Sequence, residues 1–205
     1  MKLLNNRIED VKTILKYINE TAINEFNNID MSKLMALGHS MGGMTSIEMC
    51  YKLNQEFKLC VALDPYYLAR SKMIETTSDY TLDQPLLTLF SSDFHDSPFQ
   101  KDFDSIKTHK KFYNETKEKN SLTLPSTSSK GYSSYDLTLS DTSHLNFLDT
   151  ALIMPYLLNL LNHIGSVSNA FNKLEESNSI ILAFMEENNC LPVKFGKTVS
   201  EVYQS

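Results

Sequence analysis

The chain has 205 residues, a length that predicts one domain, or one domain with an appended element. Hydrophobic residues make up 41% and charged residues 21%, so the chain can build a core and is not compositionally disordered. The 19 basic and 25 acidic residues give a net charge of −6, which is the wrong sign for binding phosphate backbones. Nucleic acid is therefore excluded as an expected partner.

The cysteines and the apolar segments indicate the compartment. Cys50, Cys60 and Cys190 are too few and too scattered for a disulfide framework, and no Cys/His cluster has the spacing of zinc ligands. Residues 1–6 are too polar for an export signal, which favours a cytoplasmic location. The most apolar segment, 152–164, is too short and too polar to span a bilayer, so we expect a soluble or surface-bound protein.

The first third of the chain predicts a helix followed by two strands with a helix between them. Apolar residues recur at intervals of three and four from Ile8 to Phe26, which is typical of an amphipathic helix. A short run over Lys33–Leu37 stops at Gly38, and helical spacing follows over Met41–Leu53. The nearly continuous apolar run over Phe57–Leu63 predicts a strand that is buried on both faces.

The rest of the chain continues this alternation. In order, the patterns predict a strand over Leu86–Phe90, a helix over Pro98–Asn120, a strand over Tyr135–Leu139, and helices over Phe147–Ile164 and Asn169–Glu187. Alternating strands and helices indicate the α/β class, with a mostly parallel sheet covered by helices on both faces. We expect residues 1–190 to form a single domain and residues 191–205 to form a loose tail.

The segment Gly38-His39-Ser40-Met41-Gly42 has the Gly-x-Ser-x-Gly pattern of a nucleophile elbow and lies at a predicted strand-to-helix turn. Flanking glycines are expected there because side chains would collide with the neighbouring strand and helix. The pattern predicts Ser40 as a nucleophile that attacks a carbonyl carbon, and the backbone N–H of Met41 as an oxyanion-hole donor. The alternative is a glycine-rich turn in which Ser40 only caps the helix.

A nucleophilic serine needs a general base and a carboxylate that orients the base. His144 follows the last predicted strand, where a loop can reach across the strand ends, and it is favoured over His95 as the base. The carboxylate is either Asp64, which ends the strand after the elbow, or Asp93, which ends the next strand, and position alone does not decide between them. Three histidines are expected to take no part: His39, which should point away from the site, His109 and His163.

The order of several motifs resembles the serine-dependent platelet-activating factor acetylhydrolase family. The matching segments are Ile29-Asp30, Leu37–Gly43, Ala62-Leu63-Asp64-Pro65, Gln84-Pro85-Leu86-Leu87 and Ser143-His144-Leu145-Asn146-Phe147. The elbow is generic, whereas the Ala-Leu-Asp and His-x-Asn-Phe segments are more specific, and the resemblance spans about residues 7–160. It implies an α/β-hydrolase fold and a catalytic triad of Ser40, Asp64 and His144.

The resemblance also implies a reaction. That family hydrolyses short or oxidised acyl chains at the middle (sn-2) position of glycerophospholipids, and it uses neither a metal nor another cofactor. A phospholipid or other small ester is then the expected substrate, and a membrane or lipoprotein surface is an expected contact. Tyr66, Tyr67, Leu68 and the segment 152–161 are candidates to face the lipid. The alternatives are a general carboxylesterase, lipase or thioesterase, and a non-catalytic hydrolase remnant.

The amino-terminal part of the sequence departs from this family. Only 39 residues precede Ser40, and a predicted helix occupies about half of them, which leaves no room for the early strands of the fold. The loop after one of those strands supplies the second oxyanion N–H, so Met41 would act alone. We therefore expect an incomplete α/β-hydrolase domain with its early strands missing, derived from a longer hydrolase.

Overall fold

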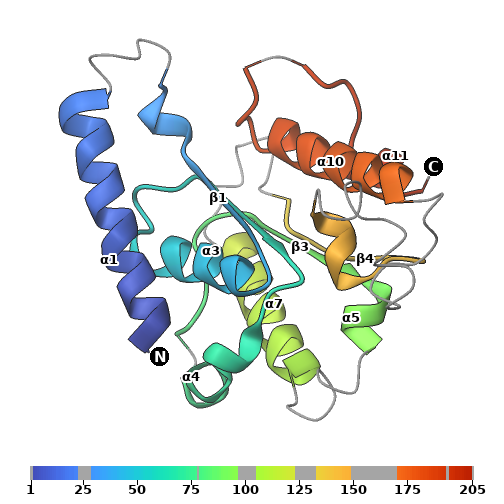
Figure 1. The fold of residues 1–205 in the computed structure, drawn as a ribbon, viewed down its shortest axis with the longest axis horizontal. Coiled ribbons are helices and arrows are strands. Elements are labelled where there is room, and N and C mark those ends of the chain that lie inside the picture. The colour runs from blue at the N-terminus through green and yellow to red at the C-terminus, as the bar shows by residue number, and fades with distance from the viewer. Residues whose placement is uncertain are drawn as a thin grey trace.

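A parallel β-sheet forms the centre of the structure, which is a computed structural model (Figure 1). The structure describes residues 2–22, 29–77, 79–96, 105–122, 133–148, 170–192 and 194–204. Within these residues the sheet has four strands in the order β1-β2-β3-β4, and all neighbours are parallel. The strands are β1 (Met35–His39), β2 (Leu59–Leu63), β3 (Leu86–Ser91) and β4 (Tyr135–Leu139). The predicted α/β class and parallel sheet are confirmed.

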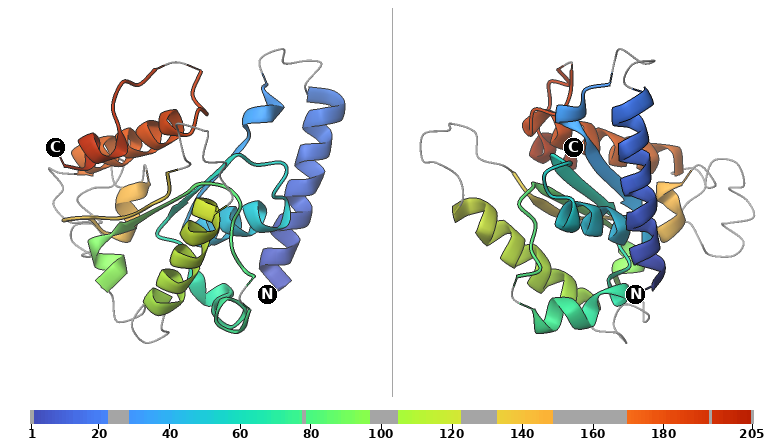
Figure 2. Two further views of the ribbon diagram at one scale, coloured as in Figure 1. Left: turned by 180° about the vertical axis from the view of Figure 1, so that it is seen from behind. Right: turned by 90° about the vertical axis from the view of Figure 1, so that its left-hand side faces the viewer.

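Helices connect the strands and lie on both faces of the sheet (Figure 2). They are α1 (Lys2–Tyr17), α3 (Met41–Lys52), α4 (Ser71–Thr76), α5 (Ser92–Asp96), α7 (Ser105–Leu122), α10 (Ala170–Glu187) and α11 (Val199–Tyr203). Shorter turns of 3₁₀ or π geometry are η1 (Ile18–Ala22), η2 (Met31–Lys33), η3 (Tyr67–Ala69) and η4 (His144–Phe147). Among these helices none has the length and apolar character needed to cross a bilayer.

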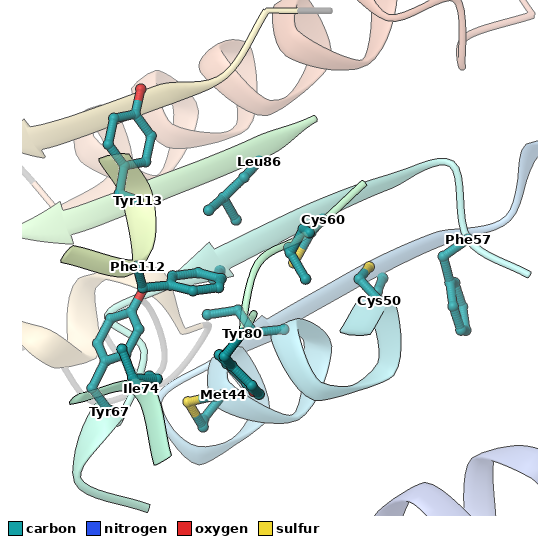
Figure 3. Close-up of a cluster of buried hydrophobic side chains, with 14 of the residues drawn as sticks. Met44, Cys50, Phe57, Cys60, Tyr67, Ile74, Tyr80, Leu86, Phe112 and Tyr113 are labelled. Carbon is teal, nitrogen blue, oxygen red and sulfur yellow. The ribbon is translucent and has the colours of Figure 1, made fainter. Parts of the chain in front are cut away.

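Two hydrophobic clusters account for the layers, because successive side chains of a strand point to opposite faces. On one face, Cys60 and Ala62 of β2 pack with residues of α3, α4 and α7, including Met44 and Phe112 (Figure 3). On the other face, Leu59, Val61 and Leu63 of β2 pack with α10 and α11. Every residue of β2 and β3 is buried, as the continuous apolar runs predicted.

Several predicted boundaries differ from those in the structure. The first helix begins at Lys2 and ends at Tyr17, where a π-helical turn follows. The segment after β3, where the sequence predicted neither a helix nor a strand, forms α5, and α4 was not predicted. Most of the helix predicted over Phe147–Ile164 lies outside the described residues, as does the candidate lipid-facing segment 152–161.

The carboxyl-terminal segment is not the loose tail that the sequence suggested. Thr198 caps α11 by accepting a hydrogen bond from the backbone N–H of Glu201, and Val199 and Val202 are buried in the second cluster. Glu187 at the end of α10 accepts a hydrogen bond from the backbone N–H of Val199 at 2.8 Å. The valines, spaced three apart, therefore attach the described part of this segment to the core.

A buried ion pair fixes the helix that follows the elbow. Glu48 of α3 is fully buried, and Arg70, which directly precedes α4, donates to it through Nε at 2.9 Å and Nη2 at 2.6 Å. Tyr80 and Lys52 also bond this carboxylate, and Arg70 donates to Asn5 of α1. Burial alone raises the pKa of Glu48, but the hydrogen bonds from Arg70, Lys52 and Tyr80 outweigh it and hold the pKa below the ordinary value of 4.5.

We expect Arg70→Met to lower the free energy of unfolding by about 3 kcal/mol, because it leaves a buried carboxylate without its main partner. Lys52→Met is the matched control, because Lys52 is partly exposed and its loss should change stability by less than about 1 kcal/mol. Since the folded-state pKa of Glu48 is lowered, the contribution of its network is present above pH 4.5 and is lost as the pH falls through the folded-state pKa. Urea denaturation of both variants at neutral and acidic pH measures these differences, and equal losses in both would contradict the assignment.

Candidate active site

The turn between β1 and α3 has the geometry of a nucleophile elbow. Ser40 adopts φ 58° and ψ −120°, a conformation that few non-glycine residues adopt. Its hydroxyl makes no helix-capping hydrogen bond, so the alternative of Ser40 as a simple cap does not describe this turn. The Ser40 N–H donates to the Leu63 carbonyl at 2.8 Å, and the Ser40 carbonyl accepts from the N–H groups of Met44 and Tyr66. Hydrogen bonds to α3 and to the segment around the end of β2 therefore hold Ser40 in its strained conformation.

Two of the three elbow glycines lie close to neighbouring backbone atoms. A Cβ on Gly38 would collide with the carbonyl of Gly42, and one on Gly43 would lie 3.1 Å from both the Leu63 carbonyl oxygen and Pro65 Cα. A Cβ on Gly42 would meet no described atom within 4 Å outside its own helix. The expectation that both glycines flanking the serine are needed to avoid collisions is thus correct for Gly38 and wrong for Gly42.

The structure brings Asp64 and His144 together. Asp64 follows β2 and is fully buried, whereas His144 begins η4 after β4. Nδ1 of His144 lies 3.0 Å from Oδ2 of Asp64. Ser91, the last residue of β3, donates its backbone N–H to Oδ1 of Asp64 at 2.8 Å and its hydroxyl to Oδ2 at 2.6 Å. Burial raises the pKa of Asp64, although the hydrogen bonds from His144 and Ser91 oppose this shift.

The loop that carries His144 is anchored on both sides. Before it, the backbone carbonyl of Thr142 accepts from the Ser92 hydroxyl at 3.0 Å and from the Asp93 N–H at 3.1 Å. After it, the side-chain carbonyl of Asn146 accepts from the backbone N–H of Ser143 at 2.7 Å. These bonds explain the polar residues of the Ser-His-Leu-Asn-Phe segment, because they fix both ends of the turn that carries the imidazole.

Aromatic rings border the imidazole of His144. Phe94 of α5 stacks on it with ring centroids 4.3 Å apart and an angle of 20° between the planes. His39 lies 4.3 Å from it with an angle of 40°, and also contacts Phe147. His39 was expected to point away from the site, so that expectation is wrong. Because His39 is bonded directly to Ser40, this contact places His144 beside the elbow.

The other candidates lie elsewhere or have other contacts. Asp93, the alternative carboxylate, is exposed at the start of α5. The side chain of His95 and the whole of His163 lie outside the described residues. His109 is buried between Tyr67, 2.9 Å from Nδ1, and Asp136, 2.8 Å from Nε2. Tyr67 is also buried, so it is not the lipid-facing residue that the sequence suggested.

His39, Asp64 and His144 are also the one group of described residues whose ligand atoms are close enough to share a metal ion, since these atoms lie within 4.8 Å of one another. Asp64 and His144 already bond each other, through Nδ1 of His144 and Oδ2 of Asp64. The two imidazoles also contact each other ring to ring, with centroids 4.3 Å apart. The arrangement therefore fits an oriented imidazole better than a metal centre.

A comparison with protein families agrees with this geometry. The family model described as platelet-activating factor acetylhydrolase, isoform II, matches residues 8–204. The chain belongs to the platelet-activating factor acetylhydrolase family. A search of curated proteins returned no match. Membership of this family supports the assignment of the chain as an ester hydrolase of lipase or esterase type.

The sequence did not predict three residues that contact Asp64 or His144 in this chain, namely Ser91, Phe94 and His39. Ser91 lies just past the strand predicted over Leu86–Phe90, although a polar residue directly after an apolar strand next to the Asp64 strand was a usable signal. Phe94 had no signal, because its contact depends on the unpredicted helix α5. His39 could have been placed by strand alternation, since it shares a sheet face with Met35 and Leu37 of β1.

The elbow predicts different effects for two glycine substitutions. We expect Gly38→Ala to lower the free energy of unfolding by at least about 2 kcal/mol, because the new methyl group collides with backbone that cannot move easily. Gly42→Ala should leave stability unchanged or raise it by up to about 1 kcal/mol, because alanine favours the helix and meets no described atom. Thermal and urea unfolding test this pair, and comparable destabilisation by both would argue against the described turn.

Proposed function

We propose that this chain is a serine esterase that hydrolyses short or oxidised acyl esters at the sn-2 position of glycerophospholipids. In this proposal Ser40 is the nucleophile, His144 the general base and Asp64 the carboxylate that orients it. The observation that carries the proposal is the 3.0 Å contact from Nδ1 of His144 to Oδ2 of Asp64, located beside a strained serine elbow. The family match supports the same reaction class.

The protonation states follow from the hydrogen bonds. With the Nδ1 proton donated to Asp64, Nε2 of His144 is the unprotonated nitrogen and can accept the Ser40 proton. The Ser40 oxygen then attacks the ester carbonyl carbon, and the oxyanion that forms is stabilised by the backbone N–H of Met41 at the start of α3. His144 returns its proton to the leaving lysophospholipid oxygen. Water, deprotonated by His144, then releases the short acid from Ser40.

The environment of Asp64 supports its role as the orienting carboxylate. A buried carboxylate is stable only when it is hydrogen-bonded, and Asp64 accepts from Ser91 twice and from His144 once. Its negative charge in a water-poor site stabilises the imidazolium that forms on His144 during the reaction. Asp93 is exposed to solvent and would interact with an imidazole much more weakly.

A cavity of about 540 Å³ lies along η3 and α4, and its lining includes none of Ser40, Asp64 and His144. Leu68 and Met73 supply apolar lining, while Lys72 supplies a positive charge. The lining also includes Arg70, which is paired with Glu48, so the preference for a phospholipid ester is proposed from the family match. A general carboxylesterase remains the second candidate, because it would use the same triad.

The proposal is tested by labelling and by substrate comparison. A fluorophosphonate probe should label Ser40 in the folded protein, and Ser40→Ala should abolish both labelling and hydrolysis. Among esters, a phospholipid with an sn-2 acetyl group should be cleaved with a higher kcat/KM than one with a long sn-2 chain or an aryl acetate. Faster cleavage of the aryl ester would favour the general carboxylesterase, and a folded wild-type protein that resists the probe would indicate a non-catalytic remnant.

The two candidate carboxylates provide a matched control within the same experiment. Asp64→Asn should lower kcat by about 10⁴-fold, because the amide favours the wrong imidazole tautomer. Asp93→Asn, on the exposed start of α5, should leave kcat within about twofold, because no reacting group depends on it. The reverse order of effects would transfer the role to Asp93.

Ser91 should control the pH dependence of the reaction. Ser91→Ala removes the hydroxyl bond to Oδ2 of Asp64, a bond that lowers the pKa of that carboxyl. Its loss raises the pKa further, so the acid limb of the kcat profile should move to higher pH, and kcat at neutral pH should fall about tenfold. Ser177→Ala is the control, since Ser177 is equally buried but lies in α10 and bonds its own helix. An unmoved acid limb in Ser91→Ala would show that this bond does not act on the reaction.

A further inference from the structure

His39 connects the element that carries the base to the strand that carries the nucleophile. It is the last residue of β1, and Ser40 follows it directly. Its ring contacts the first and the last residue of η4, at 4.3 Å between centroids for His144 and 5.9 Å for Phe147. One side chain therefore spans the short helix that presents the imidazole. Any shift of η4 along β1 would change the distance between His144 and the elbow.

A hydrogen bond reinforces these ring contacts. The backbone of His144 acts on the ring of His39 and raises its pKa, as a carbonyl does when it accepts a hydrogen bond from an imidazole. Nε2 of His39 is buried and has no hydrogen-bond partner among the described residues, so Nδ1 is the bonded nitrogen. The bond acts on the backbone of His144, and the ring contact acts on its side chain. Together they restrict both the position of the residue and the rotation of its imidazole.

The charge state of His39 suits this arrangement. Burial, followed by the repulsion from His144, lowers the pKa of His39 to about 4, so its ring is neutral near neutral pH. A neutral ring does not compete with the positive charge that forms on His144 during catalysis. His39 also contacts no carboxylate in the way that His144 contacts Asp64, within the residues described, which separates the roles of the two histidines.

We propose that His39 is a positioning residue that holds His144 at a fixed spacing from Ser40 through ring contact and a backbone hydrogen bond. The inference rests on the proposed function for its kinetic consequences, but the geometry it describes does not require that Ser40 reacts. Phe94 also stacks on this imidazole, so two rings contact the proposed base. Its Nδ1 edge faces Asp64, which leaves the Nε2 edge for the serine.

Three substitutions of His39 separate its two contacts. His39→Ala removes both, His39→Phe keeps a ring without the hydrogen bond, and His39→Asn keeps a short N–H donor without the ring. We expect His39→Ala to lower kcat by about 10- to 100-fold with KM changed less than about twofold, because the base is misplaced while substrate binding is intact. The Phe and Asn variants should each recover part of the loss. Leu37→Ala is the control, because Leu37 shares the strand face but is 56% exposed.

A second measurement does not depend on catalysis. The proton that His144 shares with Asp64 should give a downfield NMR resonance in the wild-type protein, and this resonance should broaden or vanish in His39→Ala as the ring becomes mobile. It should persist in Leu37→Ala and in Ser40→Ala. If Ser40 proves unreactive but the resonance still depends on His39, the proposed function fails and the positioning role stands. Thermal melts of all variants identify any that do not fold, and the Phe and Asn variants then carry the test.

Two results would overturn the inference. One is a folded His39→Ala protein that keeps both its kcat and the downfield resonance, since neither contact would then position the base. The other is an equal loss of kcat in Leu37→Ala, which would assign the effect to general disturbance of β1.

Discussion

The backbone of Ser40 is the constraint on which the rest of the site depends. With φ at 58° the residue is strained, and it is held there because its N–H bonds the Leu63 carbonyl while its carbonyl accepts from Met44 and Tyr66. Two of these partners flank Asp64 in the chain. The same hydrogen bonds that hold the serine turn therefore also fix the segment that carries the carboxylate, and neither group can move without the other. The buried pair of Glu48 and Arg70 adds a second link between α3 and the chain after Asp64, because it joins α3 to the residue that directly precedes α4.

The strand order explains why residues so distant in the chain meet. In a parallel sheet all carboxyl ends lie at one edge, and here the spatial order of the described strands equals their order in the chain. Ser40 and Asp64 directly follow β1 and β2, and Ser91 is the last residue of β3, so Asp64 lies between Ser40 and its own hydrogen-bond donor. His144 comes from the loop after β4 and must cross the end of β3 to reach Asp64. The bonds between Ser92 and Thr142 support that crossing, because they tie the loop to the first residue of α5.

The sequence was informative wherever a single local rule determined the structure. Continuous apolar runs identified β2 and β3 because both faces of those strands are covered, and glycines at an apolar strand end identified the elbow. The sequence was less informative where the structure depends on contacts between two distant segments. The choice between Asp64 and Asp93 was open by position, because it depends on which strand end the His144 loop reaches. The roles of Ser91 and His39 depend on the register between neighbouring strands, and the packing of α11 depends on two valines in a short, polar segment.

Positive φ angles recur around this site, and they indicate how its geometry is maintained. Ser40, Asp64 and Asp141 all adopt left-handed φ values of 58°, 41° and 53°, although none is glycine. Each such residue costs of order 1 kcal/mol or more, so the conformations persist only where surrounding contacts determine them fully. For Ser40 and Asp64 the adjacent strands supply part of those contacts, because the Leu63 and Leu89 carbonyls accept their backbone N–H groups. Two of these strained residues, Ser40 and Asp64, are members of the proposed triad, and the third, Asp141, precedes His144 by three residues. The chemistry can then rely on side chains whose positions are set before the substrate arrives, which is the condition for electrostatic stabilisation without reorganisation.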